Sequence, residues 1–257
     1  MKTMIVVILI CMLLLFLLKV PVYISMALTG CALMMATSGM KWSILTQYLY
    51  TGTNSFTLLA IPLFLLAAKL MNTGGITKKL FAFCMKVVGW LPGGLGHVNI
   101  LSSVIFAGMS GTAVSDAGGL GAIEIKAMNE NGFDNDFSCC VTAASSTMGP
   151  IIPPSIPLVV YATVSGASVG ALFMAGIVPG ILMGLALIVV VMLEVHKNHV
   201  VPSNVQKASA KERLDAFKDA FWGFLMPVII LGGIYGGIFT PTEAAAVSVV
   251  YGLFVGM

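Results

Sequence analysis

Charged side chains are scarce in this chain, and their scarcity excludes most classes of protein. Only 9% of the 257 residues are Asp, Glu, Lys or Arg, whereas 58% are hydrophobic. A soluble domain carries about 25% charged residues, so the composition predicts a polytopic membrane protein embedded in the lipid bilayer. The formal net charge of +3 comes from dispersed basic residues, which excludes a nucleic-acid partner.

Cysteine and arginine are also rare. The five cysteines show neither metal-ligand spacing nor a paired framework, so we expect them to pack as small hydrophobic residues and to hold no cofactor. They are Cys11, Cys31, Cys84, Cys139 and Cys140. The only arginine is Arg213, in a polar segment. We therefore expect a bidentate Arg clamp on a carboxylate ligand to come from a missing part of the protein or from a partner protein, or to be replaced by helix dipoles.

Histidine is too rare to support the one enzyme motif in the sequence. Residues 108–111, Gly-Met-Ser-Gly, match the Gly-x-Ser-Gly motif around the nucleophile of rhomboid-type intramembrane serine proteases. Such a serine needs a histidine base on a later helix, and the sequence places no histidine within a later span. An intramembrane protease is therefore a disfavoured alternative, and we expect no enzyme.

Apolar stretches recur along the chain at lengths that suit a bilayer. A spanning helix needs about 20 apolar residues, which predicts an all-α protein. The expected spans lie near residues 4–18, 20–38, 54–71, 168–193, 223–239 and 242–257. The first stretch has no small-residue cleavage site, so we expect it to remain as a helix. Lysines cluster at 78–86 and 197–218, and the positive-inside rule then places the N-terminus in the periplasm.

Two apolar regions are interrupted by small, polar and helix-breaking residues. The interruptions span residues 106–119 and 142–155. The first predicts a re-entrant hairpin, with halves at 94–107 and 117–129 and its tip at 108–116. The second predicts a broken helix over 137–162, because proline removes a helix donor and clashes with the preceding turn. Irregular backbone at membrane depth lines a cavity, so two such breaks indicate one binding site in a secondary transporter. Broken helices also build selectivity filters, so an ion channel is an alternative.

The two interruptions offer ligands for charges of both signs. Half-helix C-termini present carbonyls to a cation, and half-helix N-termini present N–H groups to an anion such as a carboxylate. The hydroxyls and carbonyls are hard oxygen ligands that suit sodium. The candidates for binding ion or substrate are Ser110, Gly111, Thr112, Ser115, Asp116, Thr142, Ser145, Ser146, Gly149, Pro150 and Ser155.

The acidic residues of the hairpin and of the last span have different expected roles. A carboxylate at Asp116 near the membrane centre is usually functional, although it also suits an N-cap of the second hairpin helix. Glu124 and Lys126 lie farther along that helix, where we expect solvated or interfacial side chains. Thr240, Pro241 and Glu243 predict a capping box at the start of the last span. His97 and the pair His196 and His199 are expected at interfaces.

Residues 196–222 form the one polar linker, and within it residues 210–221 predict an amphipathic helix on the membrane surface. Residues 20–28 weakly match 240–248, which suggests an inverted repeat. The expected organisation follows: scaffold helices over 1–92, hairpin and broken helix over 93–165, a helix over 166–195 that ends the first repeat, the linker, and two helices of a second repeat over 223–257.

Four segments closely resemble the large membrane subunit of tripartite ATP-independent periplasmic (TRAP) transporters, the DctM-like family. They are residues 106–116, 142–155, 176–180 and 236–245. The resemblance implies a sodium-coupled permease of the bacterial or archaeal inner membrane that imports small organic acids such as dicarboxylates or sugar acids. It also implies two partners, a periplasmic substrate-binding protein and a small membrane subunit. Family members have a second hairpin and a second broken helix, so we expect this chain to be C-terminally truncated.

The same resemblance implies an elevator mechanism and a sodium site. In an elevator, the hairpin and the broken helix slide as one unit against a fixed scaffold. The resemblance places the first sodium site between the hairpin tip and the broken helix, at Ser110, Gly111, Thr112, Ser115, Thr142, Ser145, Gly149 and Pro150. The leading sodium candidates are Ser110, Thr112, Ser145 and Gly149.

Overall fold

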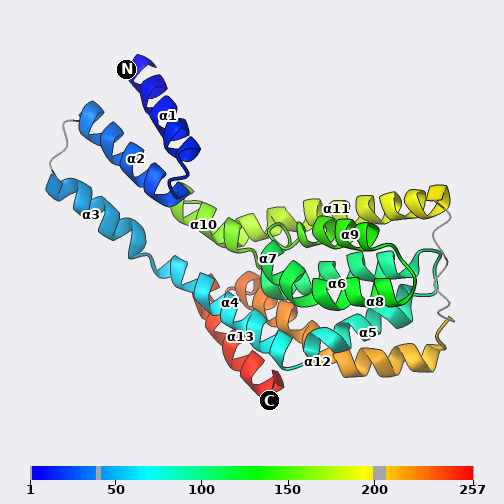
Figure 1. Cartoon of the computed structure of the whole chain (residues 1–257). Helices are drawn as coiled ribbons and strands as arrows, with labels where there is room; N and C mark the ends of the chain where they lie inside the picture. Colours follow the sequence, from blue (N-terminus) through cyan, green and yellow to red (C-terminus); the bar gives the residue numbers. More distant parts are fainter. Residues whose placement is uncertain (1, 39–41, 199–206, 257) are drawn as a thin grey trace. The chain divides into compact units, whose positions relative to one another are not determined.

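The computed structural model describes residues 2–38, 42–198 and 207–256, and every regular element in these residues is a helix (Figure 1). The chain divides into two compact units, residues 1–55 and 56–257. This agrees with the all-α membrane protein that the apolar stretches predict.

The first unit contains α1 (Lys2–Leu17), α2 (Val22–Ser38) and α3 (Trp42–Thr53). Helices α1 and α2 pack against each other, and the turn between them holds Lys19 at a φ of 61°. The expected spans 4–18 and 20–38 are thus confirmed as helices, whereas the sequence analysis did not predict α3. Large apolar side chains of α1, such as Leu13 and Leu17, are exposed, as expected of side chains that face lipid.

The second unit contains η1, helices α4 to α13 and η2, and it carries both predicted interruptions. Its elements are η1 (Phe56–Leu59), α4 (Ala60–Thr73), α5 (Ile76–Val88), α6 (Gly94–Ser110), α7 (Ala113–Ser115), η2 (Asp116–Leu120), α8 (Gly121–Glu130), α9 (Asn135–Ser146), α10 (Ile156–Ser165), α11 (Val169–Asn198), α12 (Ala210–Tyr235) and α13 (Pro241–Gly256). The sequence analysis did not predict α5.

Three helical stretches of the described residues are long and apolar enough to cross a membrane. They are Phe56–Thr73, Val169–Lys197 and Ala210–Tyr235, and they match the expected spans at 54–71, 168–193 and 223–239. The other expected spans are present as shorter apolar helices, including Pro241–Gly256 at the end of the chain.

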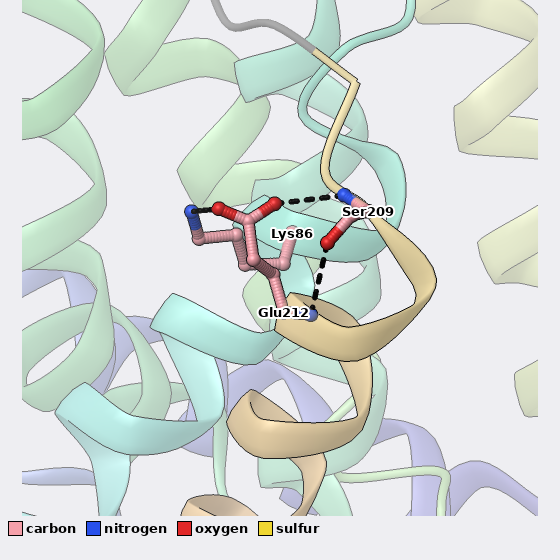
Figure 2. Close-up of polar contacts among 3 residues, drawn as sticks. All are labelled: Lys86, Ser209 and Glu212. Carbon is pink, nitrogen blue, oxygen red and sulfur yellow. Dashed lines mark hydrogen bonds and ion pairs between the residues drawn. The ribbon is translucent and has the colours of Figure 1, made fainter.

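The segment that the sequence predicts as an amphipathic helix lies at the start of α12. Residues 210–221 are the first part of one continuous helix that runs to Tyr235. Ser209 and Glu212 form a capping box there: the Ser209 N–H donates to Glu212 Oε2 (2.7 Å) and the Glu212 N–H donates to Ser209 Oγ (3.2 Å). Lys86 of α5 pairs with the same carboxylate at 3.8 Å (Figure 2). The segment is therefore fixed by its cap and by packing on α5, where the ring centroids of Phe83 and Phe217 lie 5.8 Å apart.

The capping box predicted for the last span is confirmed. The Thr240 N–H donates to Glu243 Oε2 (2.8 Å), and the Glu243 N–H donates to Thr240 Oγ1 (3.4 Å). Helix α13 then packs along α4 through small residues. A Cβ on Gly74 would lie 2.3 Å from Gly256 Cα, so the two backbones approach closely, as membrane helices with small interface residues do.

One buried apolar cluster holds α6 in position. Phe106 and Met109 of α6 pack in the same cluster as Phe64 of α4, Phe173 of α11 and Met226 of α12. All five side chains are at most 1% exposed. The C-terminal end of α6, where the first interruption begins, is thus anchored by neighbours on three other helices.

Candidate ion and substrate site

The first interruption is a tight turn between two helical segments. Helix α6 ends at Gly111, whose φ of 64° lies in the left-handed region that favours glycine. Thr112 is the N-cap of the short α7 and accepts a hydrogen bond from the Ser115 N–H (3.1 Å). A π-helical turn, η2, then begins at Asp116 and leads into α8, which packs beside α6.

Asp116 is not the N-cap of the second segment. Thr112 has that role, and the Asp116 side chain is instead 1% exposed within the π-helical turn. Such turns are common at functional sites because they change the direction of side chains along a helix. The N-cap interpretation of Asp116 is therefore wrong, and the carboxylate points into the protein.

The second interruption lies between α9 and α10, as its prolines predict. Helix α9 is capped by Asp134, whose carboxylate accepts from the Asp136 and Phe137 N–H groups (3.1 and 3.4 Å). The helical path stops after Ser146 and resumes at Ile156. Ser155 is the N-cap of α10 and accepts from the Leu158 N–H (3.3 Å). Its hydroxyl also donates to the Pro150 carbonyl.

The two interruptions meet. The Ile156 N–H donates to the Gly111 carbonyl at 3.1 Å, which joins the hairpin tip to the start of α10. A Cβ on Gly111 would lie 2.5 Å from the Pro154 carbonyl oxygen, and a Cβ on Gly149 would lie 2.8 Å from the Thr112 carbonyl oxygen. The two glycines therefore permit an approach that any side chain would block.

A buried hydrogen-bond network also joins α6 to α9, at residues that precede the C-terminal end of each helix. Asn99 Nδ2 donates to Thr142 Oγ1 (2.7 Å), and Ser145 Oγ donates to Asn99 Oδ1 (2.7 Å). Ser103 Oγ donates to Ser145 Oγ (3.1 Å). The sequence analysis missed Asn99 and Ser103. Their signal was two polar residues at i, i+4 spacing within an apolar helix, which places both on one face.

Asp116 and Ser110 are the buried groups at this site whose oxygens have no hydrogen-bond partner among the described residues. Ser110 is 0% exposed. The hydroxyls of Ser103 and Ser146 lie beside the Asp116 carboxylate, but Ser146 Oγ donates to the Thr142 carbonyl (2.7 Å). Buried polar atoms normally have partners. Unpaired hard oxygens, two of them on the Asp116 carboxylate, suit a small cation such as sodium.

A family model confirms the relationship that the two interruptions suggest. The model of the DctM component of tripartite ATP-independent periplasmic transporters matches residues 9–257. The chain belongs to this family. Its relatives are TRAP transporter permease subunits and not enzymes.

Several curated relatives are similar over most of the chain. The sialic acid TRAP transporter large permease protein SiaM of Vibrio cholerae is 47% identical over 92% of this chain and 55% of its own length. The C4-dicarboxylate TRAP transporter large permease protein DctM of the same species is 40% identical over 92% of this chain and 52% of its own length. The 2,3-diketo-L-gulonate TRAP transporter large permease protein YiaN of Escherichia coli is 40% identical over 91% of this chain and 55% of its own length. The chain thus spans about half the length of these large permease proteins.

The other predicted site residues of this DctM-family chain lie at or near the same contact. Gly149 and Pro150 lie in the break, and Ser155 caps α10 there. Thr112 accepts a hydrogen bond from the Ser115 backbone N–H in the turn of α7. Thr142 and Ser145 belong to the Asn99 network, so their hydroxyls also hold α9 against α6.

Two residues of the hairpin are more buried than expected. Glu124, predicted to be solvated or interfacial, is 1% exposed, because α8 folds back along α6 and brings Ser102 to its carboxyl group. His97, predicted at an interface, is 4% exposed. Lys126 is exposed as expected and pairs with Glu130 at 3.8 Å. His196 is exposed at the end of α11, whereas His199 lies outside the described residues.

Neither a metal cluster nor an activated serine is found in the described part of the chain. No group of three or more His, Cys, Asp or Glu side chains is close enough there to hold a metal ion. Ser110 Oγ has no hydrogen-bond partner, so no general base activates it as a nucleophile. The geometry gives the protease alternative no support.

Proposed function

We propose that this chain supplies the first ion and substrate site of a sodium-coupled importer of small organic acids in the inner membrane. The observation that carries the proposal is the contact between the hairpin tip and the broken helix, where Asp116 and Ser110 are buried with no hydrogen-bond partner among the residues that the structure describes. A carboxylate in the membrane interior costs about 2.5–3.5 kcal/mol on insertion scales. A bound sodium ion offsets this cost, and its binding at this site couples sodium entry to substrate transport.

The substrate class follows from chemistry that the relatives share. The names of these three relatives refer to sialic acid, C4-dicarboxylate and 2,3-diketo-L-gulonate, all of which carry a carboxylate. The N-terminus of α10, capped by Ser155 beside the break, offers N–H groups to such an anion. With only one arginine in the chain, helix N-termini are the natural carboxylate ligands here.

The mechanism and partners that we propose are those of a binding-protein-dependent carrier. The hairpin and the broken helix, residues 93–165, move together as an elevator unit. Hydrogen bonds connect them, because Asn99 and Ser103 donate to α9 and the Gly111 carbonyl accepts from the Ile156 N–H. Residues 1–92 form scaffold helices, and residues 223–257 begin a second repeat. A periplasmic binding protein delivers the substrate, a small membrane subunit completes the complex, and the N-terminus faces the periplasm.

Uptake by proteoliposomes tests this function. The complete large permease that contains this chain is reconstituted with its small membrane subunit, and uptake of sialic acid and of succinate is measured with the binding protein outside. We expect saturable uptake of one acid that needs an inward sodium gradient and the binding protein. Uptake that persists with potassium in place of sodium would contradict sodium coupling. Uptake without the binding protein that does not saturate would indicate a channel.

A further inference from the structure

Glu124 is a buried carboxyl group that the proposed ion site does not use. It lies on α8 with 1% of its surface exposed. Its Oε1 is hydrogen bonded to the Ser102 hydroxyl of α6, and its Oε2 has no partner among the described residues. A carboxylate in such a place is costly unless a positive charge or a proton accompanies it.

The single proton of the Ser102 hydroxyl indicates which of the two is needed. Ser102 Oγ lies 2.6 Å from the Val98 carbonyl oxygen and 3.1 Å from the Asn99 carbonyl oxygen, and it is also in hydrogen-bond contact with Glu124 Oε1. A hydroxyl has one proton, so it cannot donate fully both to the nearer carbonyl, that of Val98, and to Glu124. With an ionised Glu124, the lone pairs of two oxygens would face each other in one of these two contacts. With a proton on Oε1, Glu124 donates to Ser102 and Ser102 donates to the Val98 carbonyl, so both contacts are hydrogen bonds.

Among the described residues, no basic side chain forms an ion pair with Glu124. The titratable groups that act on it are the Asp116 carboxylate of η2 and the Cys84 thiol of α5. The ion pairs of the described residues involve Lys86, Lys126 and Lys218, and none of them includes Glu124. On α9 the titratable residues Asp136, Cys139 and Cys140 are exposed. On α6 the only titratable residue is His97, which interacts with the Pro92 backbone.

We propose that Glu124 is a proton-binding site, which holds a proton on Oε1 in the folded protein through the chain Glu124, Ser102 and Val98. An ionised Glu124 would place a second negative charge near Asp116, and the two carboxylates would repel each other. With Glu124 protonated and neutral, Asp116 is the single carboxylate of this pair that faces a cation. The inference rests on the contacts of α6 and α8 and is independent of the proposed uptake activity.

Infrared spectra of the purified complete permease at neutral pH test the proposal. A protonated carboxyl group has a C=O band separate from the bands of carboxylates. We expect this band in the parent protein and its loss in Glu124→Gln, in which an amide replaces the acid. The matched control is Glu130→Gln, because Glu130 lies on the same helix with 64% of its side chain exposed, and this variant keeps the band. Absence of the band from the parent, or its persistence in Glu124→Gln, overturns the proposal.

Two further variants keep the test decisive if Glu124→Gln does not fold. Ser102→Ala retains the acid but removes its acceptor, so we expect the band to move to higher wavenumber. An unmoved band would contradict the role of Ser102. Asp116→Asn should retain the band, and its loss there would assign the proton to Asp116 instead. The readout is spectroscopic, so it holds or fails separately from sodium-dependent uptake.

Discussion

Ser110 and Asp116 differ from the other polar residues at the candidate site because their oxygens have no hydrogen-bond partner in the described part of the chain. Thr142 and Ser145 carry hydrogen bonds to Asn99, so substitutions there change packing as well as any ion coordination. Single substitutions can therefore separate two roles that the sequence places together: groups that face an ion, and groups that hold α6 to α9.

Ser110→Ala should raise the sodium concentration needed for half-maximal uptake by the complete permease. The substitution removes one oxygen ligand and breaks no hydrogen bond, so we expect the maximal rate at saturating sodium to change less. Sodium titration of proteoliposome uptake measures both quantities. Ser165→Ala, at an exposed hydroxyl that donates to its own helix, is the matched control. An unchanged sodium dependence in Ser110→Ala would remove Ser110 from the site.

Asn99→Ala should destabilise the protein by about 1–3 kcal/mol, the usual cost of leaving buried polar groups without partners. Both Thr142 and Ser145 lose a partner in this variant. Thermal unfolding of the detergent-purified permease measures the effect. Asn129→Ala removes an exposed amide that bonds to Asn135, and it should shift the midpoint much less. Equal shifts in the two variants would show that the network adds no stability.

At the scale of elements, the hairpin and the broken helix are joined where backbone meets backbone. Gly111 combines a positive φ with a close approach to Pro154, and Gly149 packs on the Thr112 carbonyl. These contacts and the Ile156 to Gly111 hydrogen bond need no particular side chain. They need only the absence of a Cβ.

Gly111→Ala should separate the hairpin tip from the start of α10. A left-handed alanine costs about 1–2 kcal/mol, and its Cβ would lie 2.5 Å from the Pro154 carbonyl oxygen. We expect a lower unfolding midpoint and a large loss of sodium-dependent uptake. Gly118→Ala is the matched control, since a Cβ there meets nothing within 4 Å. Uptake by Gly111→Ala equal to that of Gly118→Ala would contradict the assigned contact.

At the scale of the whole molecule, many large apolar side chains are exposed, and many of the buried polar groups lie on α6, α8 and α9. Long α11 exposes residues such as Leu182, Leu185 and Val189, which suits lipid and not water. A cation bound at the junction of the hairpin and the broken helix would connect these two parts of the second unit. Binding of the cation should therefore stabilise the packing of the hairpin on the broken helix as well as the site itself.

Sodium should raise the unfolding midpoint of the complete permease, and potassium at the same ionic strength should not. A ligand that binds only the folded state adds about 2.7 kcal/mol at 100 times its dissociation constant. Asp116→Asn should reduce the sodium effect. Differential scanning fluorimetry in both salts measures it. The same midpoint in sodium and potassium would contradict specific sodium binding.

The sequence by itself determined the class of the protein, its family and the positions of its breaks. Apolar length and low charge predict membrane helices, and Gly149, Pro150 and Pro153 end a helix wherever it lies, because these are local properties of the backbone and its solvent. The capping box of Thr240 and Glu243 was predictable for the same reason.

Only the tertiary structure decided which polar groups are buried together. The fold of α8 along α6 buries Glu124 against Ser102, and the approach of α9 brings Thr142 and Ser145 to Asn99. The continuity of α12 with its amphipathic start and the presence of helices α3 and α5 also differ from the local prediction. Burial and hydrogen bonding depend on which distant segments pack together, and helical periodicity describes one segment at a time.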